Sequence, residues 1–171
     1  FDESLENYSW TYSPECLSEM MHIGRDAGFF VTYNHPNWSR EGYEQYSKYD
    51  GMHAMEIMNG GCIADGHEDY NPRVYDDFLR LGKKIYCIGA DDNHNARPDH
   101  ERRCDSGWAW TQIKADKLDY ESISDALLKG HFYASEGPEI YDLYVEDGMI
   151  YAKNERAFDK WYKEECERVF S

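Results

Sequence analysis

Acidic, amide and imidazole side chains follow directly on an apolar run in the middle of the chain. The run is KIYCIGA, residues 84–90, and the residues after it are Asp91, Asp92, Asn93 and His94. Carboxylates and neutral imidazoles bind Zn²⁺, Mn²⁺ or Fe in hydrolytic sites that leave one position open for water. In an extended segment, Asp92 and His94 point to the same side and can reach a common cation. The alternative is an Asx turn that closes the strand, because Asp and Asn are favoured in turns.

A second imidazole stands at a similar position earlier in the chain. The run FFVTY, residues 29–33, is rich in aromatic and β-branched residues and ends in NHP, which contains His35. Functional side chains of parallel α/β folds collect at the carboxyl ends of the strands. We therefore expect His35 to share a metal site with Asp92 and His94. Taken alone, a single His before Pro is more typical of a structural residue.

Basic residues follow the Asp92/His94 cluster within a few positions. The segment NARPDHERR contains Arg97, Arg102 and Arg103. Three guanidinium groups beside a metal would suit the oxygens of a phosphate group. The alternative is a solvated loop in an acidic protein. Neither a G-x-S-x-G motif nor a phosphate-cradling glycine loop occurs in the chain, so nothing points to a serine nucleophile or to a P-loop.

Apolar periodicity and punctuating residues predict an alternation of strands and helices. Ser13 and Pro14 favour the start of a helix that Gly28 ends, and Asn71-Pro72 favours the start of another. A third strand end, at MHAMEIMN, carries Glu56 and Asn59. The predicted strands are 29–33, 52–59, 84–90, 107–115 and 131–135; the predicted helices are 14–27, 39–49, one ended by Gly82, and 120–129; a hairpin over 139–153 turns at Asp147-Gly148.

This alternation predicts an α/β fold with a largely parallel sheet. The chain of 171 residues holds about four strand–helix units, whereas a complete eight-unit barrel takes about 250 residues. Because the chain begins with Phe, we expect a partial barrel whose N-terminal strands are missing. The expected organisation is a loop or truncated element at 1–12, part of a barrel at 13–153, and an amphipathic helix at 154–171.

The net charge restricts the partners of the protein. Thirty-four acidic residues against eighteen basic ones leave a formal charge of −16. This charge repels nucleic acid and anionic membranes and suits a protein that holds divalent cations. The five cysteines lack CxxC spacing, and no apolar run is long enough to cross a membrane, which together predict a cytoplasmic protein.

Four segments together resemble a known family: NHP, IGADDNHN, GWAWTQIKA and FYASEGPEI. They are similar to the C-terminal part of the PHP (polymerase and histidinol phosphatase) domain of metal-dependent phosphoesterases, from about Gly28 to about Lys153. The resemblance implies an irregular, (β/α)7-type barrel with up to three metal ions. By this resemblance His35 matches a later His ligand, and Asp92 and His94 match the terminal D-x-H. The H-x-H and the early Asp, Glu and His ligands of the family have no match, and we expect them to precede residue 1.

The function implied is hydrolysis of a small-molecule phosphate ester by metal-activated water. Asp92 and His94 would be the catalytic residues, with Asp92 also accepting the proton of the water, while Arg97, Arg102 and Arg103 would bind the substrate. With only three ligands matched, we expect this chain by itself to be weak or inactive. Two alternatives are a non-catalytic binding module that uses the many aromatic side chains, and a metal-dependent amidohydrolase. No pattern in the sequence indicates an oligomeric state.

Overall fold

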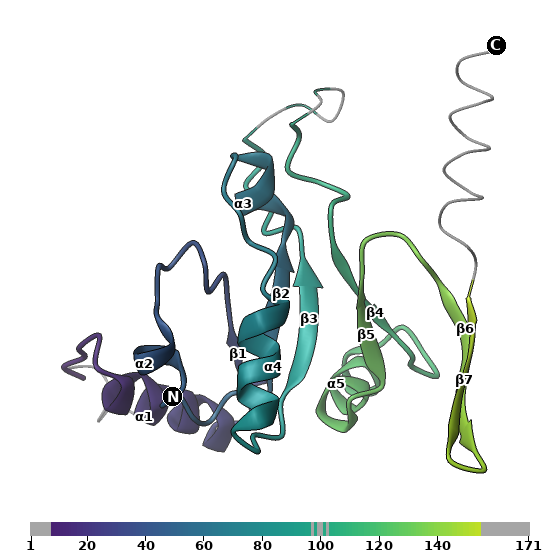
Figure 1. The fold of residues 1–171 in the computed structure, drawn as a ribbon, viewed down its shortest axis with the longest axis horizontal. Coiled ribbons are helices and arrows are strands. Elements are labelled where there is room, and N and C mark those ends of the chain that lie inside the picture. The colour runs from purple at the N-terminus through teal and green to yellow at the C-terminus, as the bar shows by residue number, and fades with distance from the viewer. Residues whose placement is uncertain (1–7, 97, 99–100, 102, 155–171) are drawn as a thin grey trace. The chain divides into compact units, whose positions relative to one another are not determined.

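The computed structural model describes residues 8–96, 98, 101 and 103–154, which form two compact units, Phe1–Ala134 and Ser135–Ser171. The helix predicted at 154–171 lies outside the described residues, apart from its first residue. The helices and strands follow in chain order (Figure 1): α1 (Pro14–Asp26), β1 (Thr32–Tyr33), α2 (Tyr43–Tyr46), β2 (Ala54–Asn59), α3 (Gly60–Ala64), α4 (Pro72–Arg80), β3 (Tyr86–Ala90), β4 (Trp110–Ile113), α5 (Tyr120–Lys129), β5 (Phe132–Ser135), β6 (Ile140–Glu146) and β7 (Met149–Asn154).

The first unit is built on a parallel sheet in the order β1-β2-β3. Thr32 pairs with Ala54, and Met55 pairs with Cys87, both in parallel register. The predicted parallel pairing of these strands is therefore confirmed. Their carboxyl ends share one edge of the sheet, which places the loops after β1, β2 and β3 next to one another. The register of β2 against β3 shifts between Glu56 and Met58, so the end of β2 is irregular.

The strands β4 and β5 form a second small sheet beside β3. The Thr111 hydroxyl donates to the Gly89 carbonyl at 2.8 Å and accepts from the Gly89 N–H at 3.2 Å. In β5, the Phe132 ring packs edge-on against Tyr86 of β3 and against Phe30, just before β1, at 5.5 and 6.0 Å between centroids. The two sheets are separate, and the partial barrel stays a prediction.

An aromatic core fills the space between the parallel sheet and α4, which lies over one face of the sheet in Figure 1. Phe78, fully buried, meets the rings of Tyr33 and Tyr46 edge-on at 6.1 and 5.7 Å. Such edge-to-face pairs add to the free energy gained by burial. The tyrosine hydroxyls are satisfied: Tyr33 and Tyr49 donate to the Glu41 carboxylate at 2.5 and 2.7 Å.

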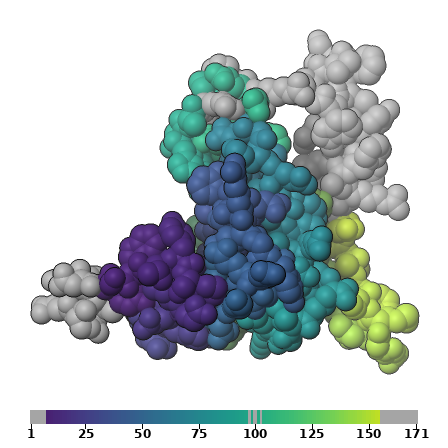
Figure 2. All heavy atoms as spheres, turned by 60° about the vertical axis from the view of Figure 1, so that its left-hand side comes forward, coloured from purple at the N-terminus to yellow at the C-terminus, as the bar shows by residue number. Residues whose placement is uncertain are grey.

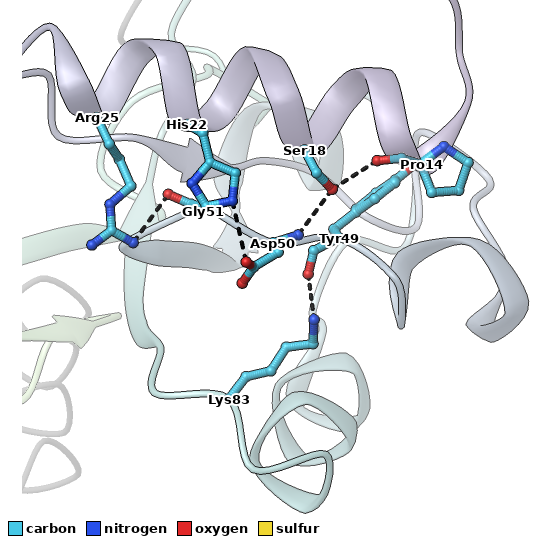
Figure 3. Close-up of polar contacts among 8 residues, drawn as sticks. All are labelled: Pro14, Ser18, His22, Arg25, Tyr49, Asp50, Gly51 and Lys83. Atoms are coloured by element: carbon cyan, nitrogen blue, oxygen red, sulfur yellow. Dashed lines mark hydrogen bonds and ion pairs between the residues drawn. The ribbon is translucent and has the colours of Figure 1, made fainter.

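The helix α1 is held against the segment that leads into β2 (Figure 3). The Ser18 hydroxyl accepts from the Asp50 N–H at 3.1 Å, His22 Nε2 lies 3.2 Å from the Asp50 carboxylate, and Arg25 donates to the Gly51 carbonyl at 3.3 Å. In Figure 2 the purple atoms of α1 lie directly against the blue atoms of the following segments. None of the helices among the described residues has both the length and the apolar composition needed to cross a bilayer.

Gly51 makes the close approach of α1 possible. Its φ angle is +101°, and a Cβ at this position would lie 2.9 Å from the Met21 Cβ. Only glycine adopts this backbone conformation without strain and leaves the helix room. On the other side of the same segment, Lys83 donates to the Tyr49 carbonyl at 2.5 Å.

Local signals predicted some boundaries correctly and others wrongly. The Ser13 side chain caps α1 as predicted, α5 spans the predicted residues 120–129, and the hairpin turns at Asp147-Gly148. The helix predicted at 39–49 is wrong over most of its length, because only α2 forms there. The short helix α3 was not predicted at all.

Phe78 provides a test of the core. We expect Phe78→Ala to lower the free energy of unfolding by about 3–5 kcal/mol, because it leaves a cavity between α4 and the sheet. The neighbouring Leu79 is 47% exposed, so Leu79→Ala serves as a control with a cost below about 1 kcal/mol. Urea denaturation followed by circular dichroism measures both values. Equal costs for the two variants would contradict the assigned core.

Candidate active site at the carboxyl edge of the sheet

The structure places His35, Asp92 and His94 at one edge of the parallel sheet. His35 follows the end of β1, and Asp92 and His94 follow the end of β3. Since β1, β2 and β3 pair in parallel, these residues extend from the same, carboxyl edge. The sequence predicted that their side chains share a metal site at this edge, and that shared site stays a prediction.

A chain of hydrogen bonds connects the loop after β1 with the loop after β3. The Glu56 Oε2 atom accepts from the His35 backbone N–H at 2.7 Å and from Asn59 Nδ2 at 3.1 Å. The same Asn59 nitrogen donates to Asp92 Oδ2 at 3.0 Å. Glu56 is 2% exposed and Asn59 is fully buried. The end of β2 therefore ties His35 and Asp92 into a single network.

Glu56 is the buried acid of this network. Burial raises the pKa of its carboxyl group, and the nearby Asp92 carboxylate raises it further. Hydrogen bonds from Asn59 and from the His35 backbone act in the opposite direction, because they stabilise the charged form. The sequence indicated Glu56 and Asn59 only as a strand end, and nothing in it showed that they would bridge the two loops.

The His94 imidazole is oriented by its own loop. Its Nδ1 atom lies 2.6 Å from the Asp92 carbonyl oxygen. If Nδ1 carries the proton and donates to this carbonyl, the lone pair of Nε2 is left for a ligand, an arrangement common to metal-binding histidines. The ring is exposed, so Nε2 is accessible from solvent.

Asp105 holds the backbone of the His94 loop. Its Oδ2 atom accepts from the His94 N–H at 2.8 Å and from the Ala96 N–H at 3.2 Å. The hydrogen bond from His94 is the main cause that lowers the pKa of Asp105. Sequence analysis missed this residue, because an isolated acid eleven positions after His94 resembles any other solvated acid.

The His35 ring is held in a comparable way. Its Nδ1 atom lies 2.9 Å from the Ser39 hydroxyl, and its ring meets Trp38 edge-on at 5.0 Å between centroids. The φ angles of His35 and Asp92 are +36° and +49°, in the left-handed region that residues other than glycine seldom adopt. Such strained residues gather at functional sites.

Asp91 has a structural role that separates it from its neighbour Asp92. Its carboxylate accepts from the backbone N–H groups of Gly107, Trp108 and Ala109 at 2.7, 2.8 and 3.0 Å. The sequence predicted a strand that begins at residue 107. Because these bonds hold residues 107–109 to Asp91, β4 begins only at Trp110. Asp91 thus fixes the loop before β4.

Two glycines let the end of β2 approach this loop. A Cβ on Gly60 would lie 2.5 Å from the Trp108 Cβ, and a Cβ on Gly61 would lie 2.7 Å from the Asp91 carbonyl oxygen. The helix α3 begins here because Asn59 Oδ1 accepts from the Cys62 N–H at 2.8 Å, which caps it.

The predicted phosphate-binding arginines are described only in part. Arg97 and Arg102 lie outside the described residues. Arg103 Nη2 lies 3.0 Å from where a Cβ on Gly66 would stand, so it approaches the loop after α3. No described group of three or more His, Cys, Asp or Glu side chains is arranged to hold a metal ion. The donors at the carboxyl edge fit Zn²⁺, Mn²⁺ or Fe by chemical type, and the metal stays a prediction.

Sequence analysis also missed two buried polar side chains beside this edge, Asp69 and Asn71. Asp69 and Asn71 are buried in the segment before α4, and in the described structure Asp69 Oδ2 and Asn71 Oδ1 have no hydrogen-bond partner. The Asp69 backbone carbonyl accepts from the Asn59 N–H at 3.1 Å, which connects this segment to the end of β2. In the sequence, the surrounding acidic loop looks solvated.

Comparison with known proteins adds no further information: no family model matches the chain, and neither the curated proteins nor the solved structures contain a match.

The buried Glu56 carboxyl predicts a specific pH dependence of stability. Its pKa is higher in the folded state than in the unfolded chain, so between these two pKa values the folded state binds more protons. The free energy of unfolding must then fall as the pH rises through this window, which begins at about pH 4.3. Glu56→Gln keeps a hydrogen-bond acceptor but has no group that titrates. We therefore expect the free energy of unfolding of this variant not to show this fall with rising pH.

Urea denaturation of Glu56→Gln and of the unchanged protein at a series of pH values gives two curves of the free energy of unfolding. Their difference isolates the titration of Glu56, because the other acids contribute equally to both curves. The exposed Glu121, in the first turn of α5, provides the control variant Glu121→Gln. Parallel stability curves for Glu56→Gln and the unchanged protein would show that Glu56 is not a desolvated acid.

Proposed function

We propose that the protein hydrolyses a small-molecule phosphate ester with metal-activated water, as the resemblance to PHP domains implies. The observation that carries the proposal is the hydrogen-bond bridge through Glu56 and Asn59. It links the loop of His35 to Asp92 at the carboxyl edge of a parallel sheet. Sites of α/β enzymes lie at this edge.

The donors that would hold the metal are His35 Nε2, the Asp92 carboxylate and His94 Nε2. Their environment supports this role, because each imidazole has a polar partner at Nδ1 and Asp92 is oriented by Asn59. When bound, a divalent ion supplies a water of lowered pKa and neutralises charge on the phosphate oxygens. The family's H-x-H has no match in this chain, so the proposed ligand set is incomplete as it stands.

The remaining roles belong to residues of the chain. Asp92 would accept the proton of the attacking water, since one of its oxygens is held by Asn59 and the side chain is exposed. Asp105 would keep His94 in place through its two backbone hydrogen bonds. Arg103, with Arg97 and Arg102, would bind the phosphate. A partial (β/α)7-type barrel and a cytoplasmic location belong to the same proposal.

His94→Ala tests the assignment. Since the ligand set is incomplete, the first readout is the affinity for Mn²⁺, measured by isothermal titration calorimetry. The second readout is the Mn²⁺-dependent hydrolysis of 4-nitrophenyl phosphate. We expect the variant to bind Mn²⁺ at least about 10-fold more weakly, by analogy with the loss caused by removing partners of metal ligands. Hydrolysis should fall by at least the same factor.

His22 offers a matched control, because it is an exposed histidine on α1 whose only charged partner among the described residues is Asp50. We expect His22→Ala to leave both readouts unchanged. Unchanged Mn²⁺ affinity in His94→Ala, or equal losses in both variants, would refute the site. Hydrolysis of an aryl amide in place of the aryl phosphate would instead favour an amidohydrolase.

A further inference from the structure

A cleft of about 460 Å³ opens between two loops of the first unit. It is lined by Asn37, Trp38, Arg40, His67 and Glu68. The first three belong to the loop after β1, and the last two belong to the loop after α3. Both loops follow the carboxyl ends of parallel strands, and the volume is within the usual range for small-molecule sites.

A single side chain, Trp38, lies between the cleft and the candidate active site. Trp38 lines the cleft, and its ring also meets the His35 ring at 5.0 Å. The His35 backbone is in turn bound to Glu56, which leads to Asp92. A ligand in the cleft would thus lie next to a proposed metal ligand.

The lining offers three kinds of recognition. Trp38 is 54% exposed, so a face of its indole is accessible for stacking on a flat ring. The Arg40 guanidinium has no carboxylate of the described residues within ion-pair distance, so it can pair with an anionic ligand. Asn37 and Glu68 supply an amide and a carboxylate that hydrogen-bond the polar edge of a ring.

The backbone of Arg40 indicates that its position is fixed by the fold. Its φ angle is +56°, a conformation that costs free energy for any residue other than glycine. His35, at the other end of the same loop, is also in the left-handed region. The loop therefore has unusual backbone conformations on both sides of Trp38.

We infer that the cleft binds the leaving group of the phosphate ester, and that this group contains a planar heterocycle, as in a nucleoside monophosphate. The inference rests on the proposed function and specifies its substrate class. The heterocycle stacks on Trp38, and its polar edge faces Asn37 and Glu68. Arg40 attracts the phosphate from the side of the cleft, in addition to the arginines proposed above. The negative net charge opposes a nucleic-acid polymer, whereas a single nucleotide needs only a local cation.

Binding can be tested without any metal. Isothermal titration calorimetry in the presence of EDTA compares adenosine 5′-monophosphate with ribose 5-phosphate, which lacks the base. We expect the nucleotide to bind about 10-fold more tightly or better, since stacking on an aromatic side chain contributes this much per base. In Trp38→Ala the two ligands should bind equally. Trp10, at 53% exposure, gives the matched control Trp10→Ala, which should keep the preference.

Arg40→Asn tests the phosphate contact. Asparagine tolerates the left-handed backbone at this position, so the variant removes the charge without adding strain. We expect both ligands to bind about 10-fold more weakly while their ratio stays constant, because the two share the phosphate. Arg80→Gln, on the exposed end of α4, is the control that should change neither affinity.

The inference is wrong if the unchanged protein binds both ligands equally, or if Trp38→Ala keeps the preference for the nucleotide. These outcomes are separate from those of the proposed function. A nucleotide preference without Mn²⁺-dependent hydrolysis would support the cleft and refute the phosphoesterase. Hydrolysis without the preference would support the phosphoesterase and refute the assigned leaving group.

Discussion

A carboxylate removed from water needs hydrogen-bond donors. At the end of β2, the donors that one buried carboxylate binds connect the loops at the carboxyl edge of the sheet. Glu56 obtains its donors from the His35 backbone and from the Asn59 amide. The first bond fixes the loop after β1, and the second orients Asn59 so that it also reaches Asp92. The network thus depends on one acid that would be unstable in its place without both partners.

Asn59 shows how one side chain can serve several elements. Its oxygen caps α3 and its nitrogen bridges two carboxylates. A carboxylate or a hydroxyl at this position could not supply both functions, because only an amide has an acceptor and two donors in one plane. The two neighbouring acids after β3 differ in a related way. Asp91 faces backbone N–H groups, whereas Asp92, whose φ angle is +49°, faces Asn59.

The parts that sequence analysis predicted are those determined by neighbours in the chain. The Ser13 cap lies next to α1, and the hairpin turn has positive φ at both Asp147 and Gly148. That the loops after β1 and β3 share one edge of the sheet followed from a general rule about parallel strands. By contrast, the truncation of β4 depends on Asp91, sixteen or more residues away, and the cleft joins loops about thirty residues apart. Periodicity contains no information about such contacts.

Cys62 is buried beside the acids of this edge. Burial raises the pKa of its thiol to about 12, and the surrounding carboxylates of Asp69, Asp92 and Glu56 raise it as well. At neutral pH the free thiol therefore keeps its proton, which makes it a poor nucleophile, since the thiolate is the reactive form. A bound cation would itself lower the pKa of a thiol, so the raised pKa bears on nucleophilic attack and not on metal binding. The oxygen and imidazole donors of the proposed metal site suit Mn²⁺, Fe or Zn²⁺ better than soft ions such as Cu(I).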